Sequence, residues 1–277
     1  FIIMKLYKLI FPLIFVSGCI SSNVLDSHTS PKSKRSVIAI QKGELSYSEK
    51  EALIILPGIG DSKKGRRHQK KYFKNQGYDL YIPDYIDRRS YEGTIDRFTK
   101  LYDEYRLGEY KKVHIFSYIL GSYVLNEFIN ESGKKNIKTI VYNRSPLQER
   151  APRVVVESFP LVTKIFAGKV LHDFSEVIYK PILNDEVNIG VVVENKATPL
   201  IRRFKKKAMS YGPIDCNNLD MNQRYDELIY IPLNHDEMYY SFDVVGLDIL
   251  EFIKYSKFTK EGRHKPYEWD PFEKNPK

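Results

Sequence analysis

The sequence contains few of the residues that usually cross-link or anchor a small protein. Only two of its 277 residues are cysteines, Cys19 and Cys216, so no disulfide framework is expected. No set of His, Cys, Asp and Glu has metal-site spacing, so we expect neither a metal nor another cofactor. There are also no internal repeats and no low-complexity blocks. What remains is a globular chain, long enough to form one domain with a well-buried core.

The charge balance is basic but shows no nucleic-acid-binding pattern. The formal net charge is +9, from 44 Lys and Arg against 35 Asp and Glu. The basic residues are scattered, with local groups at 63–67, 70–71 and 202–207. None of these groups lies in a recognised nucleic-acid module, so we expect no nucleic-acid partner. The excess suits anionic surfaces such as lipid head groups, and it equally fits a basic soluble surface.

The N-terminal segment has the features of a secretory signal. Lys5 and Lys8 precede the apolar run Leu9–Val16, which is too short to span a bilayer, and small residues follow. Val16–Cys19 resembles a bacterial lipobox, whose cysteine becomes the lipidated first residue of the mature protein. This predicts a signal peptide at 1–18, a lipidated tether at 19–35 and a membrane-anchored lipoprotein of the bacterial cell envelope. The alternative is an ordinary signal peptide with an incidental cysteine.

Two details extend this prediction. Removal of residues 1–18 would take away Lys5 and Lys8 and no acids, leaving a charge of +7. Ile20 rather than aspartate follows Cys19, which in a Gram-negative cell resembles sorting to the outer membrane.

Short apolar runs alternate with amphipathic stretches across residues 36–258. The predicted strands are Ser36–Gln41, Ala52–Leu56, Tyr78–Ile82, Lys112–Phe116, Ile137–Tyr142, Val187–Val193 and Leu228–Ile231. The predicted helices are Arg66–Gln76, Ser90–Tyr105, Ser122–Ile129, Leu161–Leu171, Pro199–Met209 and Phe242–Tyr255. The alternation predicts an α/β domain with a mostly parallel twisted sheet and helices on both faces. Residues 147–186 lack a clear strand and could form a small lid, and 259–277 read as a loose polar tail.

The most informative stretch is 113–122, where a strand meets a turn of small residues and then a helix. This layout is that of the nucleophile elbow, whose pattern is G-x-S-x-G. Placed on Ser117–Gly121, the pattern puts small residues at both flanking positions and Ile119 at the nucleophile position. An isoleucine cannot attack a carbonyl. In an alternative register Ser117 takes the nucleophile position, but the branched Ile115 and Ile119 would then crowd the turn.

Five local segments, in order, resemble the α/β-hydrolase superfamily over residues 36–256. They are Leu56–Gly60, Tyr81–Asp84, Val113–Ser122, Val191–Lys196 and Ile231–Asp236. The resemblance implies an α/β-hydrolase-like fold, an oxyanion-type loop formed by Gly58, Ile59 and Leu120, and esterase or lipase chemistry if the chain is active.

The implied catalytic residues are incomplete. His235 fits the histidine position, in a loop between the last strand and the last helix. The acid position falls near Ala197 and is vacant in this pattern, with Glu194 and Asp173 as alternative acids. Ser117 and Ser122 are the alternative nucleophiles, although each is equally explained as a packing or helix-start residue.

Three functional hypotheses follow. The leading one is a membrane-anchored hydrolase relative that has lost serine catalysis and binds a small molecule, a lipid or a protein in the former pocket. The alternative is an esterase- or lipase-type enzyme that uses Ser117 or Ser122 with His235. The third is an envelope scaffold that acts through its surface.

Overall fold

The computed structural model describes residues 37–43, 45–133, 136–183, 186–214 and 223–274. At its centre is a seven-stranded sheet in the order β1-β3-β2-β4-β5-β6-β7. The strands are β1 (Ile38–Ile40), β2 (Glu51–Leu56), β3 (Asp79–Ile82), β4 (Lys112–Ser117), β5 (Ile137–Arg144), β6 (Asn188–Glu194) and β7 (Glu227–Ile231). Only the pairing of β1 with β3 is antiparallel; the other neighbours are parallel. The predicted mostly parallel sheet is confirmed.

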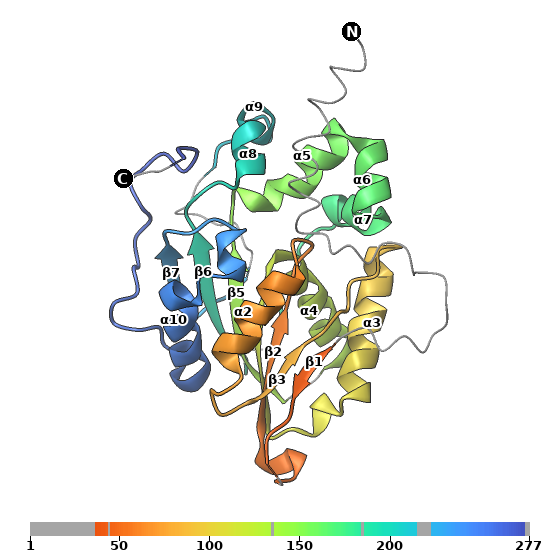
Figure 1. Cartoon of the computed structure of the whole chain (residues 1–277), viewed down its shortest axis with the longest axis vertical. Helices are drawn as coiled ribbons and strands as arrows, with labels where there is room; N and C mark the ends of the chain where they lie inside the picture. Colours follow the sequence, from red (N-terminus) through yellow and green to blue (C-terminus); the bar gives the residue numbers. More distant parts are fainter. Residues whose placement is uncertain (1–36, 44, 134–135, 184–185, 215–222, 275–277) are drawn as a thin grey trace.

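Helices cover both faces of the sheet (Figure 1). They are α2 (Lys63–Phe73), α3 (Tyr91–Glu104), α4 (Ile119–Ser132), α5 (Ala151–Ser158), α6 (Pro160–Phe166), α7 (Lys169–Glu176), α8 (Pro199–Arg203), α9 (Lys205–Met209) and α10 (Phe242–Tyr255). Alternate residues of β2 point to opposite faces, as the two-residue period of a strand requires: Ile54 packs with α3 and α4, and Leu53 packs with α2 and α10. The sheet therefore separates two hydrophobic cores.

Two predicted helices are each broken into two. The stretch predicted as one helix at 161–171 contains the end of α6 and the start of α7, because Gly168 between them has a φ of +87°. A side chain there would also meet the Arg88 carbonyl oxygen at 2.3 Å, so only glycine fits. The stretch predicted at 199–209 is α8 and α9, separated at Phe204.

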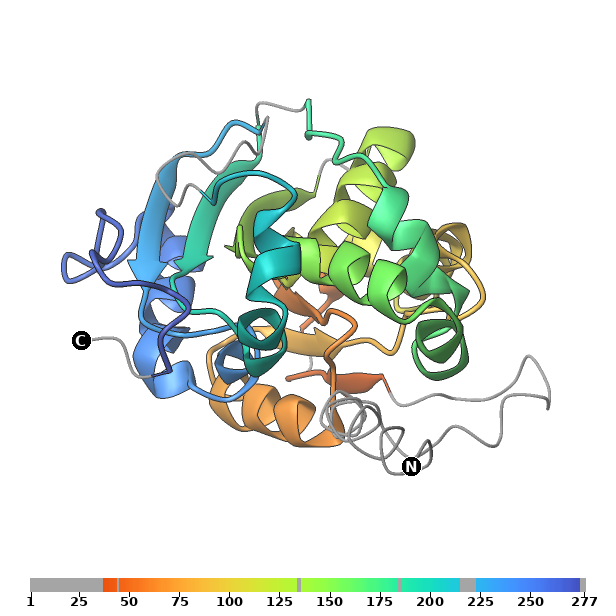
Figure 2. The same ribbon diagram turned by 90° about the horizontal axis from the view of Figure 1, so that it is seen from above.

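The helices α5 to α9 lie above the carboxyl ends of the strands (Figures 1 and 2). The segment 147–186, predicted as a lid, contributes α5, α6 and α7 to this layer. In parallel sheets ligands bind at this edge, so the layer covers the part of the molecule where a site is expected.

The C-terminal tail is not loose where the structure describes it, which corrects the prediction. The Trp269 indole N–H donates to the Asn195 carbonyl, and the Asn195 side chain accepts the Tyr267 amide. The Ala197 amide donates to the Pro271 carbonyl. The tail is thus fastened to the segment after β6, because its aromatic residues and backbone find partners there despite its polar composition.

Several predictions lie outside the described residues, namely the signal peptide, the tether, and the cysteines Cys19 and Cys216. Within the described residues, no helix is long and apolar enough to cross a bilayer. The same part of the chain holds no group of three or more His, Cys, Asp or Glu side chains able to bind a metal ion.

Candidate functional site

The turn between β4 and α4 has ordinary backbone geometry. Strand β4 ends at Ser117, α4 begins at Ile119, and Tyr118 is the single residue between them. Its φ of −81° and ψ of 170° are extended, and no residue of this turn has a positive φ. The strained conformation that holds a nucleophile above the sheet is therefore absent.

Tyr118 fills the space beside the turn. Its side chain is fully buried, and its ring stacks face to face on Tyr239 with centroids 4.1 Å apart. The hydroxyl donates to the Met238 carbonyl at 2.9 Å and accepts from the Gln69 amide at 3.3 Å. Burial raises the pKa of Tyr118 well above its ordinary value, so the phenol stays protonated and is a poor nucleophile.

The turn residue is therefore Tyr118, one position before Ile119, which the sequence pattern predicts. Ile119 is the first residue of α4 and packs in the core on the α3 and α4 side of the sheet. The sequence pattern placed the turn one residue too late. Gly121 fits the spacing of G-x-S-x-G, but it is a glycine because of close packing and not because of the turn. A side chain at Gly121 would lie 2.7 Å from the Leu56 carbonyl oxygen, so this glycine lets α4 cross close to the end of β2.

The two serines predicted as alternative nucleophiles lie beneath the turn. Both are fully buried, and their hydroxyl oxygens are 3.0 Å apart. The Ser122 hydroxyl also lies 3.2 Å from the Tyr118 carbonyl oxygen, to which it donates. Neither serine hydrogen-bonds to His235 among the contacts of the described residues.

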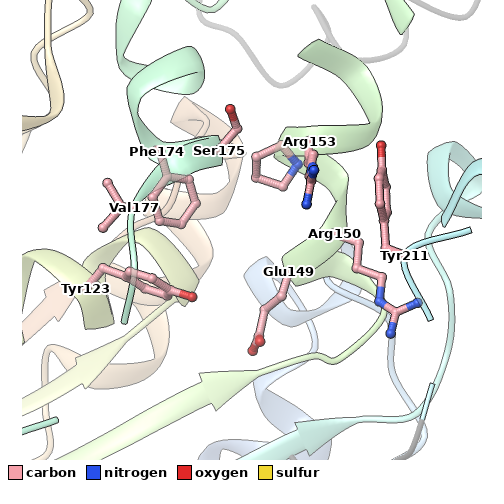
Figure 3. A pocket seen from close by; sticks show the side chains of 9 residues that line it. Tyr123, Glu149, Arg150, Arg153, Phe174, Ser175, Val177 and Tyr211 are labelled. Carbon is pink, nitrogen blue, oxygen red and sulfur yellow. The ribbon is translucent and has the colours of Figure 1, made fainter. Parts of the chain in front are cut away.

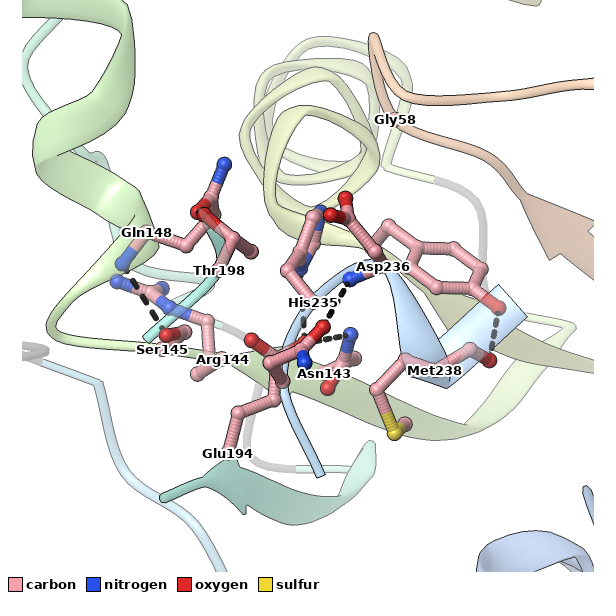
Figure 4. Close-up of polar contacts among 12 residues, drawn as sticks. Gly58, Asn143, Arg144, Ser145, Gln148, Glu194, Thr198, His235, Asp236 and Met238 are labelled. Carbon is pink, nitrogen blue, oxygen red and sulfur yellow. Dashed lines mark hydrogen bonds and ion pairs between the residues drawn. The ribbon is translucent and has the colours of Figure 1, made fainter. Parts of the chain in front are cut away.

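A buried histidine–carboxylate pair is present at the carboxyl edge of the sheet (Figure 4). His235 Nδ1 lies 2.8 Å from Glu194 Oε1. Glu194 is the last residue of β6, and its register partner on β7 is Ile231, four residues before His235. The parallel pairing of β6 and β7 therefore brings the two side chains together. Asn143, on the neighbouring strand β5, donates its side-chain amide to the same carboxylate oxygen at 2.7 Å.

The pair corrects the prediction that the acid position is vacant near Ala197. The carboxylate that pairs with His235 is that of Glu194, on the strand end itself and three residues earlier, and the sequence pattern offers Glu194 only as an alternative. Asp173, the other alternative, lies on α7, where it accepts from the Tyr91 amide and pairs with Lys169. Sequence reasoning missed Asn143, and its position at the end of an apolar strand was the only signal for it.

Electrostatics favour protonation of this histidine. Burial by itself would lower the pKa of His235, but the charge of Glu194 and its hydrogen bond outweigh burial, so the pKa of His235 is raised. His235 Nε2 has no hydrogen-bond partner among the described residues, and its ring meets Tyr118 and Tyr239 edge-on. The second oxygen of Glu194, Oε2, is buried without a partner in the same part of the chain.

The predicted oxyanion-type loop lies beside this pair, but one of its backbone amides already donates a hydrogen bond within the protein. The Gly58 amide donates to the Tyr239 hydroxyl at 3.1 Å. The amides of Ile59 and Leu120 have no hydrogen bond among the described residues. A Cβ at Gly58 would lie 3.4 Å from the Tyr118 Cβ and 3.9 Å from His235 Nε2, so loop, turn and histidine converge at one point.

A pocket of about 260 Å³ lies between α4, α5 and α7 (Figure 3). It is lined by Tyr123, Glu149, Arg150, Pro152, Arg153, Phe174, Ser175, Val177 and Tyr211. Glu149 is paired with the buried Arg144 at the end of β5. Arg150 donates to three carbonyl oxygens, those of Ala208, Gly212 and Pro213. The lining thus combines aromatic rings with charged groups of both signs.

The order of the site residues along the chain agrees with a hydrolase layout. The strand–turn–helix crossing comes first, the carboxylate on β6 follows, and the histidine after β7 comes last, as in the order nucleophile, acid, histidine. The fold is α/β-hydrolase-like.

Comparisons with known proteins find structural neighbours but no relative by sequence. No protein-family model and no curated protein matches the sequence. An α/β hydrolase enzyme from a Medee basin deep-sea metagenome library has a TM-score of 0.49 and 13% identity, over 81% of this chain and 96% of that chain. A structure from work on two metagenome-derived lipolytic enzymes, LipS and LipT, has a TM-score of 0.49 and 10% identity, over 74% of this chain and 94% of that chain.

A lipase-esterase related protein from Clostridium acetobutylicum has a TM-score of 0.47 and 10% identity, over 79% of this chain and 98% of that chain. At such identities these proteins say nothing about individual residues, whose roles follow only from the contacts described above.

Proposed function

We propose that this protein is an α/β-hydrolase-fold protein that does not use serine catalysis and acts as a binding protein. The observation that carries the proposal is Tyr118, which stands between β4 and α4 with a protonated, hydrogen-bonded phenol. Serine catalysis needs a hydroxyl within reach of a histidine, and Ser117 and Ser122 instead bond to each other under the turn. The pocket between α4, α5 and α7 offers a small ligand aromatic and charged contacts.

This proposal predicts no His235-dependent ester hydrolysis. The full chain should hydrolyse short-chain p-nitrophenyl esters no faster than its His235→Gln variant, and a fluorophosphonate probe should label neither protein. The reason is that His235 has no nucleophile to deprotonate. Turnover by the wild type that disappears in His235→Gln, together with labelling, would contradict the proposal.

One observation favours a second candidate, an esterase- or lipase-type enzyme. The His235–Glu194 pair is intact, and Nε2 is without a partner among the described residues on the side facing the loop at Gly58. For activity, a change in the turn would have to bring a serine hydroxyl within roughly 2.6–3.2 Å of Nε2. The same labelling experiment separates the candidates: peptide mapping of a labelled protein would find the probe on Ser117 or Ser122, and Ser117→Ala or Ser122→Ala would abolish it.

We further propose that Cys19 carries a lipid that anchors the protein to the bacterial cell envelope. The support is the lipobox-like Val16–Cys19 segment behind a basic and apolar start. Mass spectrometry of the protein purified from its own membrane should find Cys19 as the modified N-terminal residue, and Cys19→Ser should release the protein from the membrane fraction. An unmodified Cys19 in the mature chain would refute this.

A further inference from the structure

Helix α6 has its apolar residues on the outside. Leu161, Ile165 and Phe166 are 75%, 69% and 50% exposed, although all three are large hydrophobic residues. The polar Thr163 instead faces the protein, where its hydroxyl bonds to the Phe159 carbonyl and to His172. This is the reverse of the pattern on a helix that covers a soluble protein, whose apolar side is buried. Figure 1 shows α6 at the outer edge of the layer above the sheet.

The exposed residues form one continuous stripe. Leu161 and Ile165 are four residues apart and therefore neighbours on the helix surface. The partly buried Val162, three residues before Ile165 and four before Phe166, joins Phe166 to them. A contiguous apolar patch of this kind is typical of an interaction surface, whereas single exposed hydrophobic residues are not.

Three of the last four carbonyls of α6, those of Thr163, Ile165 and Phe166, have hydrogen-bond partners. The Arg88 guanidinium donates to the carbonyl oxygens of Ile165 and Phe166 at 2.9 and 2.6 Å. The Thr163 carbonyl accepts from the amides that follow the helix. Unpartnered carbonyls at a helix end are costly in an apolar medium, because no water is there to bond them. The cost of moving this end of α6 into such a medium is therefore reduced.

Two cationic groups border the stripe. Lys164 lies on α6 itself and is exposed, and the Arg88 guanidinium lies at the end of the helix, on the carbonyls of Ile165 and Phe166. The carboxylates that flank α6 in sequence are neutralised, since Asp173 pairs with Lys169 and Glu157 pairs with Lys207. An apolar stripe bordered by a net positive charge matches the boundary between acyl chains and anionic head groups.

We propose that α6 is a membrane-docking helix that inserts Leu161, Ile165 and Phe166 into the surface of a bilayer containing anionic phospholipids. Docking would hold the layer of α5, α6 and α7, and the pocket below it, against the membrane. A second copy of the chain would also cover an apolar stripe, but Lys164 and Arg88 would then face the same positive groups of the other copy and repel them. The proposal depends neither on a lipid at Cys19 nor on the activity of the site.

Tryptophan fluorescence in the full chain tests this directly. Trp269 is the only tryptophan, so Trp269→Phe gives a silent background in which Phe166→Trp serves as the α6 reporter. Leu247→Trp in the same background is the α10 reporter and the matched control, because Leu247 is an exposed apolar residue on another helix. With vesicles of phosphatidylcholine and phosphatidylglycerol, the emission of the α6 reporter should shift to the blue and be quenched by brominated phospholipid. The emission of the α10 reporter should do neither.

Two further measurements fix the interpretation. Adding Leu161→Ser and Ile165→Ser should weaken vesicle binding of the α6 reporter by about ten-fold or more, because two large apolar side chains are lost from the buried face. Vesicles without phosphatidylglycerol should bind it less well. Equal responses of the α6 and α10 reporters would overturn the proposal. So would a blue shift of the α6 reporter that grows with protein concentration in the absence of vesicles, since that would show a second copy on the stripe.

Discussion

Replacing Tyr118 with alanine should lower the free energy of unfolding by about 3–5 kcal/mol. The ring is fully buried and stacked on Tyr239, so its removal takes away apolar contacts and leaves a cavity. It also leaves the Met238 carbonyl without the hydroxyl that donates to it. Urea denaturation of the wild type and the variant, followed by circular dichroism, measures the difference.

The matched control is Tyr118→Phe, which keeps the ring and removes only the hydroxyl. Its cost should be roughly 1 kcal/mol, the value of one hydrogen bond. If Tyr118→Ala costs no more than Tyr118→Phe, the ring does not fill the turn region, and the main support for a protein without serine catalysis is lost.

The second large effect is expected at the buried pair. His235→Ala should lower the free energy of unfolding by about 3–5 kcal/mol near pH 6, because it leaves the carboxylate of Glu194 buried without its charged partner. Asn143 would remain as its single donor, since Glu194 Oε2 has no partner among the described residues. Urea denaturation again gives the difference. His68→Ala, which removes an exposed imidazole on α2, should change stability little.

This loss should depend on pH in a definite direction. The pKa of His235 is raised in the folded state, so the folded protein holds the proton more tightly than the unfolded chain, where the pKa is about 6.5. The stabilisation from the charged pair is fully present below that value and is lost as the pH rises through the folded-state pKa. The difference in the free energy of unfolding between the wild type and His235→Ala should therefore become smaller as the pH rises from about 6 to about 9. A difference that grows over this range would show that His235 is neutral in the folded protein.

How far the sequence predicts this site can be judged from three residues. His235 is predicted because the segment Ile231–Asp236 resembles the α/β-hydrolase loop that carries the histidine, at the end of a parallel strand where ligands bind. Glu194 was only an alternative, because its role depends on the pairing of β6 with β7, which places it 2.8 Å from a residue 41 positions away. Tyr118 was overlooked as the turn residue, because the spacing of small residues fits Ile119 and the start of α4 is a matter of backbone conformation.

Residue periodicity and apolar runs are local properties, so they are enough to predict the alternation of strands and helices, and with it the mostly parallel sheet. The sequence pattern favours Ile119 at the turn and leaves Ser117 and Ser122 as alternatives. Three features become visible only in the folded molecule: the pairing of Glu194 with His235, the tyrosine ring in the turn, and the outward apolar side of α6. These three depend on which surfaces meet after folding, and contacts between distant segments leave no periodic trace in the chain.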